Sequence, residues 1–300
     1  MNKFFFKKVH KSGNYDIYLF NKKIYSGIHW KYYNLDYGII DYNTYTMING
    51  HLNKNYNRNE FNKISIIYPV YYTHNNHNTF YKLIDRYNSY SNEVKEKLNL
   101  IFIDDGSKFP LNLPENNLNI TLLRINIDKP WNQSGARNLG ACYASDETLI
   151  MMDADWFMPE KTFIFYSQID IYDNEIIPLP WTESLSIQAK RVLPNLFIIK
   201  KQTFFHINCY DEDYCGIYGD DLFFRKYIFS KNIKVRIFDV PVLPHGEYIH
   251  NNSHNLHRNT TSIRKKLCKN YKLKHSKKIL NFPWTVTEQN NFKPIEHSTD

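Results

Sequence analysis

Between residues 64 and 152, apolar runs of strand length alternate regularly with helical stretches, and this alternation constrains the fold most. The runs are Ile64–Val70, Leu98–Ile103, Ile120–Arg124 and Thr148–Met152. Short apolar runs are typical of strands buried on both faces of a sheet. Strands that alternate with helices pair in parallel through right-handed crossovers. The sequence therefore predicts an α/β domain built on a parallel sheet.

Polar and acidic residues follow these runs where the predicted strands end. Pro69 lies near the end of the first run, Asp104 and Asp105 follow the second, and Asp153 and Asp155 follow the fourth. Ligands of parallel α/β sheets bind beyond the carboxyl ends of the strands. We therefore expect these residues to gather on one rim of the sheet.

Asp153-Ala154-Asp155 places two carboxylates one residue apart at a strand end. Two such groups repel each other unless a cation lies between them, and Mg²⁺ and Mn²⁺ prefer oxygen ligands. The pattern indicates a divalent metal and a phosphorylated donor. A solvated turn is the alternative interpretation of this motif taken alone.

Two further motifs have both a functional and a structural interpretation. In Asp104-Asp105-Gly106-Ser107, an aspartate could accept hydrogen bonds from a base or a ribose, or the motif could be an ordinary Asp-Gly turn. In Asn132–Gly140, small residues would let a helix N-terminus approach a ligand, and Arg137 could pair with a phosphate. The alternative there is a helix start with small packing residues.

Asp220 and Asp221 follow Gly219 and precede an apolar helix face. Acidic residues at a helix N-terminus are explained by the helix dipole and by capping alone. One of the two carboxylates could also act as a general base.

Taken in order, these elements resemble the family 2 glycosyltransferases of the GT-A fold, which are nucleotide-sugar-dependent and mostly inverting. The resemblance runs from about Ile64 to His245. It implies a GT-A type, Rossmann-like mixed sheet that is mostly parallel and flanked by helices. It also implies a UDP-sugar donor, a Mn²⁺ or Mg²⁺ cofactor and a glycan, lipid or protein acceptor.

The resemblance also implies roles for individual residues. Asp155 would be the direct metal ligand, with Asp153 beside it and His245 completing the site, although His250 and His254 are alternatives. The residues expected to contact the nucleotide sugar are Pro69, Val70, Tyr71, Asp104, Asp105, Arg137, Asp153 and Ala154.

Asp220 and Asp221 occupy the place of the family's Glu-Asp pair, which carries the catalytic base. That pattern favours Asp221, whereas a Gly-Asp-x-x-Phe-Phe pattern of some members selects Asp220, so the choice stays open here. Trp181 lies where the family places its acceptor loop, and stacking on a sugar or core packing would each explain it.

Composition narrows the class of protein less than the motifs do. The chain is 42% hydrophobic, which excludes wholesale disorder, and its net charge of +8 suits anionic partners. Its four cysteines form no CxxC pair, and no apolar run reaches the length of a membrane span. We expect a cytoplasmic protein, in the host's cytoplasm if the chain is viral.

We divide the chain into a β-rich extension (1–60), a GT-A domain (61–255) and a basic helical tail (256–300) that could contact an anionic membrane surface. Two other functions are weighed. A nucleotidyltransferase would want a glycine-rich loop after the first strand, and residues 71–76 contain no glycine. A non-catalytic basic binding protein on a degenerate transferase domain would use the tail, but every acidic position of the expected site is filled, which argues against degeneracy. Nucleic acid is not the expected partner.

Overall fold

The structure is a computed structural model of the chain. It describes residues 61–245 apart from 75, 130, 183–190, 216–219, 232, 239, and also residues 275–292. Nearer the N-terminus it describes the backbone of four short strands: β1 (Phe5–Val9), β2 (Asn14–Leu19), β3 (Lys22–Ile28) and β4 (Met47–Ile48).

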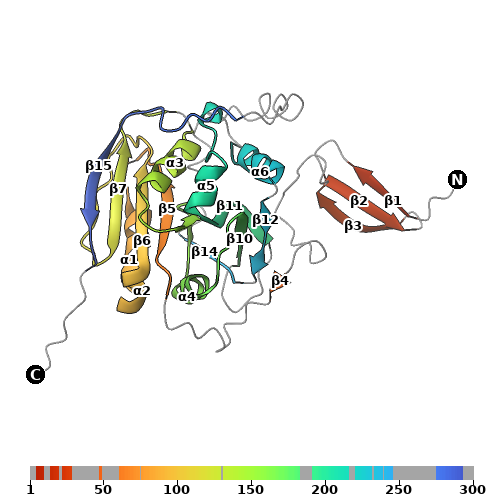
Figure 1. Cartoon of the computed structure of the whole chain (residues 1–300), viewed down its shortest axis with the longest axis horizontal. Coiled ribbons are helices and arrows are strands. Elements are labelled where there is room, and N and C mark those ends of the chain that lie inside the picture. The colour runs from red at the N-terminus through yellow and green to blue at the C-terminus, as the bar shows by residue number, and fades with distance from the viewer. Residues whose placement is uncertain are drawn as a thin grey trace, which may run out of the picture.

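The domain is organised around one eight-stranded sheet in the order β12-β10-β11-β8-β5-β6-β7-β15 (Figure 1). Its four middle strands are mutually parallel and are those predicted from the sequence: β8 (Thr148–Met151), β5 (Ile64–Val70), β6 (Leu98–Asp104) and β7 (Asn119–Ile125). The outer strands are β11 (Arg191–Lys200), β10 (Glu175–Trp181), β12 (Lys234–Val235) and β15 (Trp284–Asn290). Because β11 and β15 run antiparallel to their inner neighbours, the predicted mixed, mostly parallel sheet is confirmed.

Helices cover both faces of the sheet. One layer contains α1 (Asn78–Asn88), α2 (Asn92–Lys97) and α4 (Glu160–Gln168), and the other contains α3 (Gln133–Tyr143), α5 (Lys201–His206) and α6 (Asp220–Ser230). Figure 1 shows the second layer above the sheet and the first below it. Helix α1 forms because Phe80, Leu83, Ile84 and Tyr87 recur at helical spacing and are all buried.

Alternation along the strands supplies the two apolar cores. On β5, Ile66 and Tyr68 pack in the core on the α1 side, whereas Ile67 packs in the core on the α3 side. Gly140 lets α3 lie close to the sheet, because a Cβ there would be 2.5 Å from Ile67 Cγ2 and 2.8 Å from Ile103 Cδ1. This close packing brings the start of α3 to the carboxyl ends of the parallel strands.

The predicted basic helical tail is wrong for the part that the structure describes. Residues 246–274 lie outside the described part of the chain, residues 275–283 contain no helix, and Trp284–Asn290 forms edge strand β15. Strand β15 pairs antiparallel with β7, so the main sheet extends beyond the predicted boundary at residue 255. Alternating threonines and the β-branched Val286 favour a strand here.

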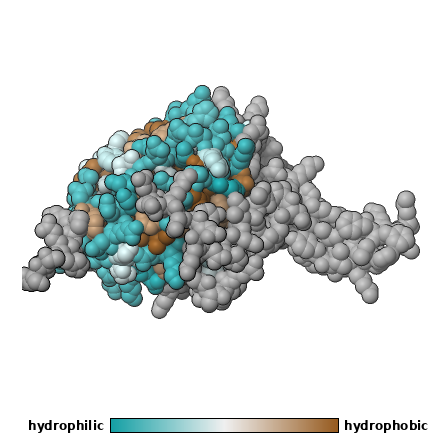
Figure 2. Space-filling model, turned by 60° about the horizontal axis from the view of Figure 1, so that its bottom comes forward, coloured by the Kyte–Doolittle hydropathy of each residue, from teal (hydrophilic) through white to brown (hydrophobic). Residues whose placement is uncertain are grey.

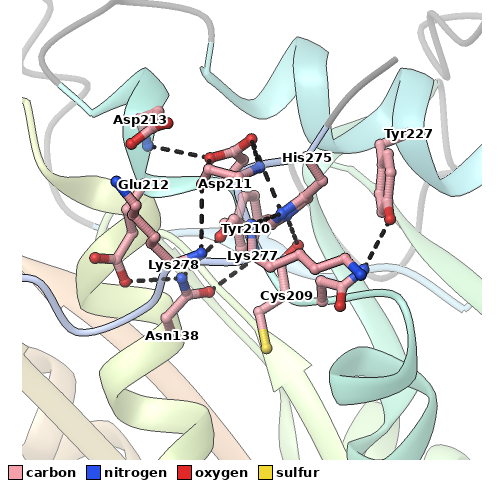
Figure 3. Close-up of polar contacts among 12 residues, drawn as sticks. Asn138, Cys209, Tyr210, Asp211, Glu212, Asp213, Tyr227, His275, Lys277 and Lys278 are labelled. Atoms are coloured by element: carbon pink, nitrogen blue, oxygen red, sulfur yellow. Dashed lines mark hydrogen bonds and ion pairs between the residues drawn. The ribbon is translucent and has the colours of Figure 1, made fainter.

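Two acidic residues fasten the segment that leads into β15 (Figure 3). Glu212, at the start of a short 3₁₀ helix (Glu212–Tyr214), is 4% exposed and accepts hydrogen bonds from the backbone N–H groups of Leu280 at 2.7 Å and Asn281 at 3.0 Å. The same carboxylate accepts from Asn138 Nδ2 on α3 at 3.0 Å. Asp211 accepts from the Ser276 backbone N–H at 2.9 Å. The C-terminal segment is thereby joined to α3.

Strands β1, β2 and β3 form a separate antiparallel sheet (Figure 1), in agreement with the β-rich extension predicted near the N-terminus. Strand β4 pairs instead with β13 (Ile237–Phe238) of the main domain.

The described surface is mainly hydrophilic on the face in Figure 2, where hydrophobic residues form small separate patches. The exposed large hydrophobic residues, among those described, lie in different parts of the chain: Ile127, Tyr143, Tyr172 and Val286. None of the described helices combines the length and the apolar character needed to cross a bilayer.

Candidate active site

Three consecutive side chains at the start of α3 each donate a hydrogen bond to an aspartate of a different motif. The pairs are Asn132 Nδ2 with Asp105 Oδ1 at 3.0 Å, Gln133 Nε2 with Asp153 Oδ1 at 2.7 Å, and Ser134 Oγ with Asp220 Oδ2. One helix N-terminus therefore contacts the two acidic motifs that were predicted to share a rim, and also Asp220, for which no such position was predicted.

The two aspartates that end β6 have different surroundings. Asp104 is buried, accepts from the Ser107 backbone N–H at 2.8 Å and forms an ion pair with Arg124, so its carboxylate holds the loop together. Asp105 accepts instead from Asn132. Burial raises the pKa of Asp105 to about 8, and the Asn132 hydrogen bond opposes this shift in part. Of the pair, Asp105 is the better placed to contact a ligand.

Gly106 is required for the turn after these aspartates. Its φ of +73° is unfavourable for residues with a side chain, and a Cβ would lie 2.4 Å from the Ile127 carbonyl oxygen.

The predicted base-flanking residues lie beside Asp105 at the end of β5. Val70 is buried, and its carbonyl accepts the Asp105 backbone N–H at 2.9 Å. Pro69 and Tyr71 are half-buried, and the Tyr71 hydroxyl lies 3.3 Å from each carboxylate oxygen of Asp128. A planar ligand held by Asp105 would therefore have Tyr71 for a neighbour.

Arg137 is a fully buried cation with spare donors. Its Nη2 forms an ion pair with Asp153 Oδ1, and its Cζ lies 5.6 Å from the centre of the Tyr210 ring. Its Nε and Nη1 have no hydrogen-bond partner among the described residues. Buried guanidinium donors are normally paired. The unpaired donors fit an anionic ligand such as a phosphate group.

Two short strands bring His245 next to Asp155. Strand β14 (Leu243–Pro244) pairs antiparallel with β9 (Trp156–Phe157), and the His245 backbone N–H donates to the Asp155 carbonyl at 2.7 Å. The His245 ring is 2% exposed and places Nε2 2.8 Å from the Thr79 carbonyl oxygen. Its Nδ1 has no partner within the described part of the chain. Burial lowers the pKa of His245, which favours the neutral ring that a metal requires.

The exposed Asp155 carboxylate and the unpaired Nδ1 of His245 fit a divalent cation in their donor chemistry. The predicted set of Asp153, Asp155 and His245 is not drawn together, since the described residues contain no group of three metal-ligating side chains. Asp153 Oδ1 is instead engaged by Arg137 and Gln133. Ala154, between the aspartates, is half-buried.

Asp220 and Asp221, adjacent at the start of α6, have contrasting partners. Asp221 forms an ion pair with Arg225 Nη2 at 2.7 Å, one turn along the helix. Asp220 is 3% exposed and accepts from Ser134. Burial and the Asp221 carboxylate raise the pKa of Asp220 to about 6. A carboxylate with a raised pKa of this kind is suited to proton transfer.

Trp181, at the end of β10, is half-buried and packs edge-to-face on Trp156, with ring centres 5.3 Å apart. Trp156 directly follows Asp155. The indole of Trp181 therefore packs on the residue that follows Asp155, the candidate metal ligand. This position fits both roles predicted for Trp181, stacking on a sugar and packing in the core.

The sequence motifs predict no individual role for Asn132, Gln133, Ser134 or Tyr210. The first three stand within the small-residue motif at the start of α3, so their position was a usable signal. Tyr210 lies in an irregular segment after α5, and no local pattern indicates its contact with Arg137.

Several solved glycosyltransferase structures are similar to this chain. For the catalytic domain of Drosophila β1,4-galactosyltransferase 7, the TM-score is 0.49 and the identity 12%, over 72% of this chain and 83% of that one. For a mannosyltransferase from Pyrobaculum calidifontis in complex with GDP-Man and Mn²⁺, the values are 0.45 and 14%, over 63% and 58%. For residues 1–349 of S. aureus TarS they are 0.45 and 12%, over 61% and 60%. No family model and no curated protein matches the sequence.

Proposed function

We propose that this protein is a metal-assisted glycosyltransferase that moves a sugar from a nucleotide-diphosphate donor, a UDP-sugar in the first instance, to an acceptor hydroxyl with inversion. The observation that carries the proposal is buried Arg137. Its unpaired donors stand beside the Asp153-Ala154-Asp155 motif, on the helix whose N-terminus also contacts Asp105 and Asp220. Positive charge at a helix N-terminus is suited to binding a diphosphate.

In this proposal the donor lies across the carboxyl ends of β5, β6 and β8. Asp105 accepts a hydrogen bond from the base, Tyr71 flanks it, and Arg137 donates to the diphosphate. Asp155 and His245 would hold a Mn²⁺ or Mg²⁺ ion, which when bound neutralises the charge of the diphosphate leaving group.

We assign the proton transfer to Asp220, although the sequence pattern favoured Asp221. The Asp221 carboxylate is held in an ion pair by Arg225. The pKa of Asp220, in contrast, lies near the pH at which a general base works best. Asp220 takes the proton of the acceptor hydroxyl as that oxygen attacks the anomeric carbon from the face opposite the diphosphate. Trp181 is the candidate surface for an acceptor sugar, lipid or protein.

The test is Mn²⁺-dependent release of the nucleoside diphosphate from a panel of UDP- and GDP-sugars, with water as the acceptor. Asp155→Ala is expected to lower the rate by about 10²-fold or more, since a metal ligand contributes several kcal/mol to charge stabilisation. Asp173→Ala, an exposed residue at the opposite edge of the sheet, is the control and should retain the wild-type rate.

Other outcomes of this assay favour the other functions. Release of pyrophosphate would favour a nucleotidyltransferase. Nucleotide-sugar binding without turnover would favour a non-catalytic binding protein, and neither binding nor turnover would contradict the proposal altogether.

A further inference from the structure

Ser134 links the first turn of α3 to the first turn of α6. Its side chain is 1% exposed, and its hydroxyl donates to Asp220 Oδ2. The N-cap of α3 is Asn132, so the hydroxyl of Ser134, two residues further on, is not needed to cap the helix. Here the hydroxyl instead reaches a carboxylate on another helix.

The two carboxylate oxygens of Asp220 accept hydrogen bonds from different donors. Oδ1 accepts the Asp221 backbone N–H at 3.0 Å, within the same helix, and Oδ2 accepts from Ser134. Within the described part of the chain, Ser134 is the one side chain hydrogen-bonded to this carboxylate. Without it, only a bond within α6 would set the carboxylate's orientation.

We propose that Ser134 is a positioning residue that holds the Asp220 carboxylate in the orientation from which it accepts the proton of the acceptor hydroxyl. This inference rests on the proposed function. Helix α3 then has two roles. Its N-terminal end orients the Asp220 carboxylate, and the same end places Gln133 and Arg137 against Asp153 at the donor site.

The charged and titratable groups around Asp220 fix the direction of the expected pH effect. Asp221 on α6 raises the pKa of Asp220, whereas Arg137 and the Ser134 hydrogen bond on α3 lower it. The neutral side chains of Tyr210 and Cys215 complete its electrostatic surroundings. Because a hydrogen bond to an ionised group stabilises the ionised form, loss of the Ser134 hydroxyl raises the pKa of Asp220.

The experiment compares the pH dependence of kcat/KM for UDP-sugar hydrolysis in wild type and Ser134→Ala. Wild type should lose activity as the pH falls through about 6, where Asp220 becomes protonated. In Ser134→Ala this acid limb should move upward by about one pH unit, the order expected for one hydrogen bond to a charged group. The KM for the donor should stay within about twofold, because among the described residues the Ser134 hydroxyl is hydrogen-bonded to Asp220 and not to a donor-binding residue.

Ser65→Ala is the matched control. Ser65 is also buried and donates to an aspartate, Asp146 Oδ2, at 2.7 Å, but it lies at the start of β5, on the opposite edge of the sheet. Its loss should cost stability without moving the acid limb. Ser134→Thr keeps a hydroxyl and should restore the wild-type limb. If Ser134→Ala does not fold, Ser134→Cys keeps the volume with a weaker donor and should move the limb in the same direction.

Two failures are distinguishable. A wild-type enzyme that turns over donor with an acid limb near pH 6, left in place by Ser134→Ala or Ser134→Cys, would overturn the positioning role and leave the proposed function intact. A wild-type protein that turns over no nucleotide sugar would overturn both. A ¹³C NMR titration of the Asp220 carboxyl group, assigned with Asp220→Asn, reads the same shift without any substrate.

Discussion

Replacing Glu212 by alanine is expected to lower the free energy of unfolding by about 3–5 kcal/mol. The buried carboxylate accepts hydrogen bonds from two backbone N–H groups of the C-terminal segment and from Asn138. Its removal would leave these donors without their acceptor around a carboxylate that is itself 4% exposed, and each donor left unsatisfied in a buried site costs about 1–3 kcal/mol. Urea denaturation at pH 7 measures the change as a shift of the midpoint.

Asp213→Ala is the control for this prediction, because Asp213 belongs to the same short helix but its side chain is exposed. It should change the free energy of unfolding by less than about 0.5 kcal/mol. A loss below about 1 kcal/mol in Glu212→Ala would contradict the view that Glu212 fastens the C-terminal segment to α3.

The second large effect is on the pH dependence of stability, through Asp105. The pKa of Asp105 is raised to about 8 in the folded protein by burial, from about 3.9 in an unfolded chain. The folded state therefore keeps a proton that the unfolded state loses. This contribution to stability is complete below about pH 4, declines as the pH rises and levels off above about pH 8, for a total of about 5 kcal/mol.

Asp105→Asn keeps the acceptor for Asn132 but does not titrate. It should match wild type near pH 4.5 and become more stable than wild type by up to about 5 kcal/mol at pH 9. Urea denaturation at pH 4.5, 7 and 9 measures the difference, in which the contributions of other titrating groups largely cancel. Parallel curves for the two proteins would show that Asp105 ionises normally in the fold.

The sheet was largely predictable from the sequence, because its signals are local. Strands β5, β6, β7 and β8 are apolar runs bounded by polar residues, and α1 and α3 follow from spacing. Strand β15 was missed because the basic residues before it suggested one continuous helical tail. What makes Trp284–Asn290 a strand is its pairing with β7, about 160 residues earlier in the chain, which no local pattern reveals.

The sequence motifs identify the candidate residues of the site, but not the side chains that those residues contact. The ends of the apolar runs predicted that Asp105 and Asp153 lie at one rim of the sheet, and the start of α3 contacts both, whereas its contact with Asp220 was not predicted. Their individual environments depend on contacts between distant segments. Three of the aspartates form ion pairs with arginines: Asp104 with Arg124, Asp221 with Arg225 and Asp153 with Arg137. These ion pairs determine which carboxylates can bind a ligand or accept a proton.

Inverting transfer is a single displacement at an anomeric carbon, and time-resolved ¹H NMR of Mn²⁺-dependent hydrolysis of UDP-α-sugars observes its outcome directly. Early in the reaction, before mutarotation, the released sugar should be the β anomer, and Asp220→Asn should abolish its formation. Initial release of the α anomer, or turnover that Asp220→Asn leaves unchanged, would contradict the account.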